Sequence, residues 1–205
     1  MIPDQPEPSD ATRFATRPSV GVCGFGRCGS TMLMAMLDAG GIPPAGDVDS
    51  RSYELPDAKQ MPNLPADVLA GRSIKLLDAI LYGLVPRMDG WRFIWLDRQP
   101  HQQAKSQVKF FRGAGHKVPA RTVKTFEASY ERDRPRALAQ LVELGRVHIV
   151  SYEAVLADPL VAAHALAAFL APDLRLDAAA AATAVHARGA RCVDGLTFES
   201  TGAHP

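Results

Sequence analysis

A glycine-rich segment, residues 24–31 (Gly-Phe-Gly-Arg-Cys-Gly-Ser-Thr), has the residue types of an anion-binding turn. It follows an apolar run at residues 20–23 and precedes apolar residues at helical spacing in residues 30–39. Its three glycines let the backbone bend so that several N–H groups can face one point. The start of the helix adds unpaired N–H groups and the positive end of its dipole. The order strand, glycine loop, helix therefore predicts a nest for a phosphate-like anion.

The charge of this loop departs from the usual phosphate-binding P-loop. The spacing Gly24-x4-Gly29 matches that motif, and Thr31 occupies its hydroxyl position. Ser30, however, stands where the P-loop has a lysine, and the nearest cation is Arg27 inside the loop. We therefore expect the loop to keep the backbone geometry that binds an anion, while a residue other than position 30 supplies the positive charge.

Two other interpretations fit the same glycines. The segment also satisfies G-x-G-x-x-G, but no acidic residue clearly ends a second strand about 20 positions on, as a dinucleotide site expects. The turn could also simply join a core strand to a core helix. The flanking context and the hydroxyl residues favour anion binding over a purely structural turn.

A second pair of polar residues lies far along the chain. Arg98 follows the apolar run at residues 91–96, and Ser106 comes eight residues later, in the predicted next helix. The carboxyl ends of parallel strands face the ligand crevice, so Arg98 would point toward the same site as the loop. An arginine fork and a neutral hydroxyl suit a second phosphate.

The segments that position these residues alternate between strand and helix patterns. Short apolar runs typical of buried strands occupy residues 20–23, 73–77, 91–96 and 147–150. Spacing, caps and early prolines predict helices over residues 30–39, 100–112, 123–144 (interrupted near Pro135), 159–169 and 177–186. Residues 42–71 are expected to form a long irregular loop. The alternation predicts an α/β fold, a P-loop three-layer α/β/α arrangement around a central parallel sheet.

Length and composition favour a single domain. The chain has 205 residues and a formal net charge of +1 at pH 7, and we expect a flexible arm over residues 1–18 and one domain over residues 19–205. We find no signal peptide and no apolar stretch of membrane-spanning length, so the expectation is a cytoplasmic protein with no membrane insertion and no nucleic-acid partner. The three cysteines lack C-x-x-C spacing, and the histidines lack metal-ligand spacing. No metal site is therefore expected.

Taken together, the motifs resemble those of sulfotransferases that use 3′-phosphoadenylyl sulfate (PAPS), most of all short bacterial sulfotransferase-like P-loop proteins. That family's 5′-phosphosulfate loop typically has the pattern P-[KR]-S-G-[ST]-T, and here the sequence is Gly26-Arg27-Cys28-Gly29-Ser30-Thr31. Its 3′-phosphate motif, an arginine with a serine eight residues later, matches Arg98 and Ser106. Residues 150–159 look like its Y-E-x-[LV]-x-x-[DN]-P element, which would place Tyr152 near the adenine. Gly26 and Cys28 replace the usual proline and serine.

The resemblance implies transfer of a sulfuryl group from PAPS to a hydroxyl or amine, leaving 3′-phosphoadenosine 5′-phosphate (PAP). Arg27 would bind the bridging oxygen and the oxygens of the sulfuryl group, and Lys75 could also contact the sulfuryl group. Positioning and charge stabilisation would carry the catalysis, and no divalent metal is expected. The general base stays open between Asp78, just beyond the strand at residues 73–77, and Glu54 in the long loop.

Two alternatives to a sulfotransferase remain at this stage. One is a P-loop small-molecule kinase, which would need ATP and Mg²⁺ and against which Ser30 counts. The other is a non-catalytic nucleotide-binding protein on the same fold. For the sulfotransferase, a small molecule or glycan is the expected acceptor.

Overall fold

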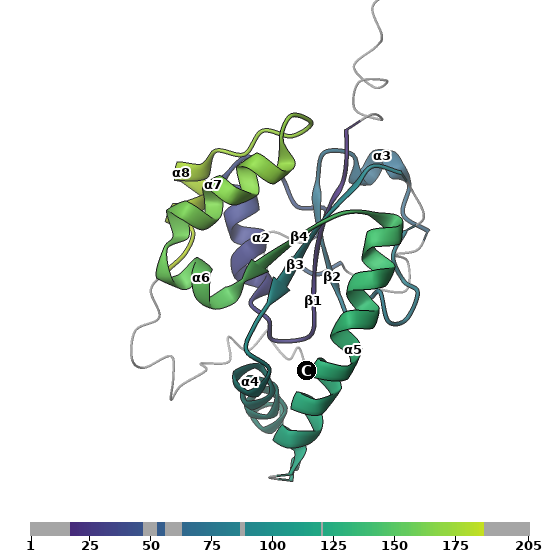
Figure 1. Cartoon of the computed structure of the whole chain (residues 1–205), viewed down its shortest axis with the longest axis vertical. Helices are drawn as coiled ribbons and strands as arrows, with labels where there is room; N and C mark the ends of the chain where they lie inside the picture. Colours follow the sequence, from purple (N-terminus) through teal and green to yellow (C-terminus); the bar gives the residue numbers. More distant parts are fainter. Residues whose placement is uncertain (1–16, 47–52, 56–62, 87–88, 120, 187–205) are drawn as a thin grey trace, which may run out of the picture.

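The computed structural model describes residues 17–46, 53–55, 63–86, 89–119 and 121–186. Four parallel strands form a sheet in this part of the chain: β1 (Val20–Gly24), β2 (Ser73–Leu77), β3 (Trp91–Asp97) and β4 (Gly145–Ser151). Their order is β2-β1-β3-β4, with β1 and β3 in the middle (Figure 1). Because the strands are parallel, their carboxyl ends meet at one edge of the sheet.

Strands β1, β2 and β3 are buried on both faces, whereas in the edge strand β4 only Val150 is buried. In β3, Ile94 and Leu96 belong to one apolar core, whereas Phe93 and Trp95 belong to the other. This period of two follows from the pleat of a strand. Near-continuous apolar strands of this kind are typical of parallel sheets covered on both sides.

Helices cover the two faces and make the fold a three-layer α/β/α arrangement (Figure 1). The first face packs against a group of four helices: α2 (Ser30–Ala39), α6 (Tyr152–Ala157), α7 (Pro159–Leu170) and α8 (Ala178–Thr183). The opposite face packs against α3 (Ala66–Leu69) and the second half of α5 (Thr122–Leu144). The predicted fold class is thus confirmed.

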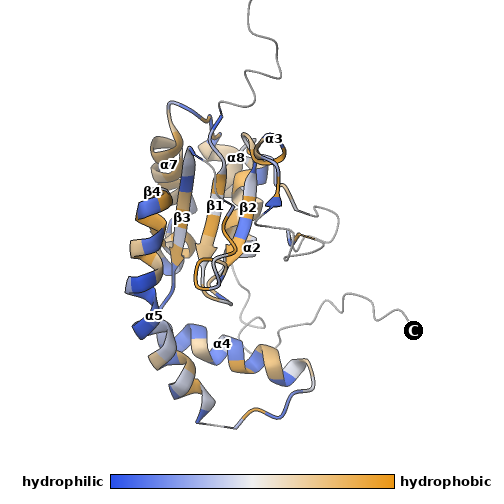
Figure 2. Ribbon diagram, turned by 90° about the vertical axis from the view of Figure 1, so that its right-hand side faces the viewer, coloured by the Kyte–Doolittle hydropathy of each residue, from blue (hydrophilic) through white to orange (hydrophobic). Residues whose placement is uncertain are grey.

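One helix belongs to neither layer. Helix α4 (Pro100–Gly113) lies beyond the carboxyl ends of the strands, beside the first half of α5 (Figure 2). It begins at the proline predicted for its first turn and ends one residue later than expected. Its position matters for function because it faces the loop that follows β1.

The predicted elements agree with the structure to within a few residues, with three exceptions. The expected break of α5 at Pro135 is wrong, because the helix continues through it. Proline has no backbone N–H, so the carbonyl of Glu131, four residues earlier, lacks its helical hydrogen bond. Both residues are exposed, and water can bind that carbonyl instead. The last helix ends at Thr183 and not near His186, and the short helices α3 and α6 were not predicted.

No helix in the described ranges combines the length and the apolar character that crossing a bilayer would take.

Candidate anion-binding and catalytic site

The loop between β1 and α2 holds a conformation that its glycines make possible. Gly29 is the N-cap of α2 and has φ 108°, a left-handed conformation that disfavours side chains. A Cβ atom on Gly29 would lie 2.5 Å from Cδ2 of Tyr152, so packing excludes a side chain as well. The start of α2 therefore approaches the Tyr152 ring closely, with its N–H groups at the carboxyl edge of the sheet.

The carbonyl groups of the loop are bound by side chains from outside it. The Gln103 amide donates to the carbonyl oxygens of Phe25 and Gly26, at 3.0 and 2.9 Å. Arg98 Nη1 donates to the carbonyl oxygen of Arg27 at 2.8 Å. These bonds hold three successive carbonyl groups in place.

The two arginines singled out in the sequence meet at this loop. Arg27 Nε lies 3.5 Å from Ser106 Oγ, and the guanidinium of Arg27 covers the Phe110 ring at 5.1 Å from its centroid. The guanidinium of Arg98 covers the Tyr152 ring at 4.4 Å. The aromatic faces support both cations by cation–π contact. The structure thus brings Arg27, Arg98 and Ser106, distant in sequence, into one cluster.

A lysine from β2 lies at the start of α2. Lys75 Nζ donates to Thr31 Oγ1 at 3.1 Å and to Glu54 Oε1 at 2.7 Å. The Lys75 side chain is 4% exposed, whereas the Glu54 side chain is 57% exposed. A buried ammonium therefore lies beside the first turn of the helix, although Ser30 occupies the lysine position of the loop.

A cavity of about 910 Å³ opens between these groups. Among its described lining residues the charged groups are three cations, Arg27, Lys75 and Arg98, and one carboxylate, Glu54. The excess of positive charge favours an anionic ligand. The rest of the lining comprises apolar and aromatic side chains, the loop glycines and uncharged or weakly basic polar side chains, namely Met32, Ala35, Tyr53, Leu77, Phe110, Tyr152, Leu156, Ala184, Gly26, Gly29, Ser30, Thr31, Gln107 and His186.

Several predicted site residues do not line this cavity within the described part of the chain: Cys28, Asp78 and Ser106. Cys28 is fully buried, and burial raises the pKa of its thiol to about 11. Its sulfur would lie 2.7 Å from a Cβ atom on Gly24, so it fills the space beneath the start of the loop. Ser106 reaches the cluster through Arg27.

Asp78 lies behind the loop. Burial raises the pKa of its carboxyl group, and the backbone N–H of Gly26 donates to it and acts in the opposite direction. The other candidate base, Glu54, lines the cavity. The structure therefore separates the two carboxylates that the sequence left equivalent.

Backbone strain is concentrated around the same site. Among the described residues other than glycine, positive φ angles occur at Arg27 (66°), Tyr53 (56°) and Asp78 (55°). Arg27 and Tyr53 line the cavity, and Asp78 is hydrogen-bonded to its loop. Such conformations cost about 1–3 kcal/mol each and persist where the surrounding structure enforces them, which is common at functional sites.

Sequence reasoning missed Gln103 and Gln107. Both lie on α4 on the face that carries Ser106 and Phe110, at spacings of three and four residues. In the sequence, this helix face combines polar and aromatic residues, and that combination is the signal that could have indicated a contact between α4 and the loop. Gln107 lines the cavity, and its Oε1 atom would lie 2.8 Å from a Cβ atom on Gly26.

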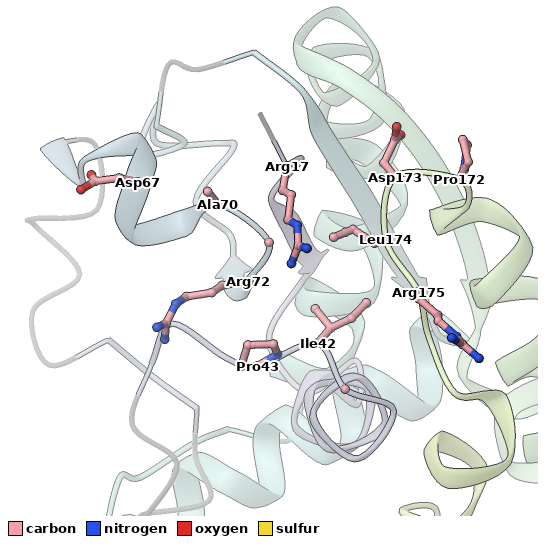
Figure 3. A pocket seen from close by; sticks show the side chains of 12 residues that line it. Arg17, Ile42, Pro43, Asp67, Ala70, Arg72, Pro172, Asp173, Leu174 and Arg175 are labelled. Carbon is pink, nitrogen blue, oxygen red and sulfur yellow. The ribbon is translucent and has the colours of Figure 1, made fainter. Parts of the chain in front are cut away.

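Another cavity, of about 680 Å³, lies at the opposite edge of the sheet. Its lining includes Arg17, Arg72 and Arg175, together with Asp67 and Asp173. Asp173 pairs with Arg92. The three arginines point in different directions (Figure 3), in contrast to the cations that meet at the loop. This cavity is therefore the weaker candidate for an anion site.

No family model and no curated protein matches the chain. Among solved structures, the sulfotransferase domain from the curacin biosynthetic pathway is similar over 75% of this chain and 74% of its own length, with 17% identity and a TM-score of 0.47. The sulfotransferase from Alicyclobacillus acidocaldarius is similar over 80% of this chain and 85% of its own, with 14% identity and a TM-score of 0.46.

Proposed function

We propose that the chain is a sulfotransferase, which moves a sulfuryl group from PAPS to a hydroxyl or amine of a small-molecule or glycan acceptor. The observation that carries this proposal is the arrangement of cations around a loop without a lysine. Arg27, Lys75 and Arg98 come from three different segments and line one cavity. Two anionic groups on one ligand would explain why two arginines, one in the loop and one after β3, line the same cavity.

The residues present suit such a co-substrate. The N-terminal turn of α2 and Thr31 would hold its 5′-phosphate, as helix N-termini hold anions. Arg98 and Ser106 would hold the 3′-phosphate, and the apolar side chains beside Tyr152 would receive the adenine. The cavity volume, about 910 Å³, is in the usual range for ligand sites. When bound, PAPS supplies an activated sulfuryl group.

The protein's own part in the reaction is mainly electrostatic. Arg27 and Lys75 would stabilise negative charge on the transferred group and on the departing phosphate. Lys75 is suited to this because its buried ammonium is already fixed by Thr31 and Glu54. Little reorganisation is then needed when charge develops.

The proton of the acceptor would go to the Glu54 carboxylate. Glu54 lines the cavity and is more than half exposed, so an acceptor can reach it. Asp78 lies behind the loop, where the Gly26 N–H binds it. We therefore propose Glu54 as the general base and assign Asp78 a supporting position under the loop.

A thermal-shift comparison tests the nucleotide class. PAP should raise the melting temperature more than AMP does, because only PAP carries a 3′-phosphate. Arg98→Ala should remove this difference between the two ligands. Arg72→Ala, a matched loss of one arginine at the opposite edge of the sheet, should preserve it. Equal shifts by PAP and AMP in the unmodified protein would contradict the proposal, and ATP turnover with Mg²⁺ that survives Arg98→Ala would favour a kinase.

Two isosteric substitutions separate the candidate bases. With an acceptor found by screening hydroxyl and amine compounds, Glu54→Gln should lower kcat by about 10²–10⁴-fold, the usual size of general-base catalysis. Asp78→Asn should keep kcat within about tenfold, because Asn can still accept the Gly26 hydrogen bond. Steady-state rates of PAP formation measure both. If Asp78→Asn abolishes turnover while Glu54→Gln keeps it, the assignment is reversed.

A further inference from the structure

The side chain of Gln103 links α4 to the backbone of the loop that follows β1. Gln103 is 4% exposed, although its amide is polar. Its nitrogen donates to two successive loop carbonyls, those of Phe25 and Gly26, at 3.0 and 2.9 Å. We propose that Gln103 is a positioning residue that sets the conformation of the anion loop and the direction of the Arg27 side chain. The identity of the ligand in this inference rests on the proposed function.

The two bonds fix two peptide planes. A peptide unit is planar, so holding the carbonyl of Phe25 also fixes the N–H of Gly26, which lies in the same plane and points in the opposite direction. Holding the carbonyl of Gly26 likewise fixes the N–H of Arg27. The two peptide units that precede the Cα atom of Arg27 are therefore held in place, and with them the position from which the Arg27 side chain extends.

Arg27 needs this support because its backbone is strained. Its φ of 66° is unfavourable for a residue with a Cβ atom. A free loop would relax toward negative φ and carry the guanidinium elsewhere. The Gln103 bonds precede Arg27 and the Arg98 bond follows it, so the strained residue is held from both sides. Strain of this kind persists where the surroundings over-determine it.

The same helix completes the setting of Arg27. Ser106 and Phe110, which contact the guanidinium, lie three and seven residues after Gln103 on α4. Gln103 thus anchors the helix to the loop backbone while the next two turns receive the side chain. A shift of α4 relative to the loop would misplace both contacts together.

The test compares Gln103→Met with Gln102→Met in the full chain. Methionine keeps the length of the side chain and removes the donor, and Gln102 is exposed on the same helix. Calorimetry would measure two ligands, PAP and adenosine 3′-phosphate. For Gln103→Met we expect about tenfold weaker PAP binding, the size of two lost hydrogen bonds. The affinity for adenosine 3′-phosphate should fall less, by about threefold, because Arg98 follows β3 and only Ser106 of the proposed 3′-phosphate contacts lies on α4. Gln102→Met should leave both affinities unchanged.

A ligand-free measurement separates this inference from the proposed function. Hydrogen exchange of the backbone amides of residues 25–31 should become about tenfold faster in Gln103→Met and stay unchanged in Gln102→Met. Unchanged exchange in Gln103→Met would overturn the inference, as would an equal loss of affinity for both ligands. If the unmodified protein binds neither nucleotide, the proposed function fails, and the exchange result still decides the role of Gln103.

Discussion

Gly29 illustrates how one residue can meet two separate physical demands. Its φ of 108° strains any residue with a Cβ atom, and the Tyr152 ring fills the space where a Cβ atom would lie. The first demand comes from the local turn, and the second comes from a residue far away in the sequence. Only the first could be foreseen from the glycine pattern.

Gly29→Ala should therefore be more damaging than an ordinary glycine substitution. We expect it to lower the free energy of unfolding by about 2–4 kcal/mol, because backbone strain and overpacking against Tyr152 add together. Gly41→Ala is a matched control, since Gly41 has φ 93° but no atom within 4 Å of its Cβ position. Its cost should be about 1 kcal/mol. Urea unfolding of both variants gives the comparison, and equal losses would show that the Tyr152 contact is unimportant.

The missing lysine of the loop is also resolved at the residue scale. Ser30 cannot supply a charge, but Lys75 from β2 places its ammonium 3.1 Å from the hydroxyl of Thr31. A buried lysine is costly unless it is paired, and Glu54 pairs with it. A cation from the neighbouring strand thus adds to Arg27, the cation within the loop itself.

At the scale of elements, the three helices that follow β4 in the chain begin at side-chain caps. Ser151 Oγ accepts from the N–H of Ala154 at the start of α6. Asp158 Oδ1 accepts from the N–H of Val161 at the start of α7, and Asp177 does the same for Ala180 in α8. These caps satisfy N–H groups that a helix leaves unpaired. They fix the turn between α6 and α7, and with it the position of Tyr152.

Loss of the α7 cap gives a test at this scale. Asp158→Ala should lower the free energy of unfolding by about 1 kcal/mol, with a range of about 0.5–2, because the Val161 N–H loses its acceptor. Asp158→Asn should retain most of the stability, since asparagine is an equally good cap. Thermal or urea unfolding measures both variants. A loss of the same size in Asp158→Asn would point to the charge of Asp158 instead of its hydrogen bond.

At the scale of the whole molecule, arginines gather in two places although the net charge is only +1. Arginines line cavities at both edges of the sheet, and the five residues of β1 separate the two edges by about 16 Å. That distance exceeds the screening length of about 8 Å at physiological salt. The two edges should therefore act independently under those conditions.

The double substitution Arg72→Ala, Arg175→Ala tests this independence. At 0.15 M salt we expect the affinity for PAP to stay within about twofold of that of the unmodified protein. At 0.01 M salt, where the screening length is about 30 Å, the double variant should bind PAP about two- to threefold more weakly. Calorimetry at the two salt concentrations measures this. A tenfold loss at 0.15 M would place the anion site at the opposite edge.

Much of the fold follows from the sequence because its signals are local. The apolar runs of β1, β2 and β3, the proline that begins α4 and the Asp158–Pro159 start of α7 each specify an element through neighbouring residues. The interruption expected at Pro135 failed because a single proline can be tolerated where water reaches the exposed carbonyl. The short helices α3 and α6 carry too few residues to give a periodic signal.

The sequence by itself determined the glycine loop, the arginine after β3 and the serine eight residues later, because each depends on residue type and short spacing. The tertiary structure alone decided that Lys75 reaches Thr31, that Gln103 holds the loop carbonyls and that Glu54 lines the cavity while Asp78 lies behind the loop. The physical reason is that the Lys75 and Gln103 contacts join residues between 44 and 78 positions apart. Only the parallel packing of the strands, which gathers their carboxyl ends at one edge, brings such residues together.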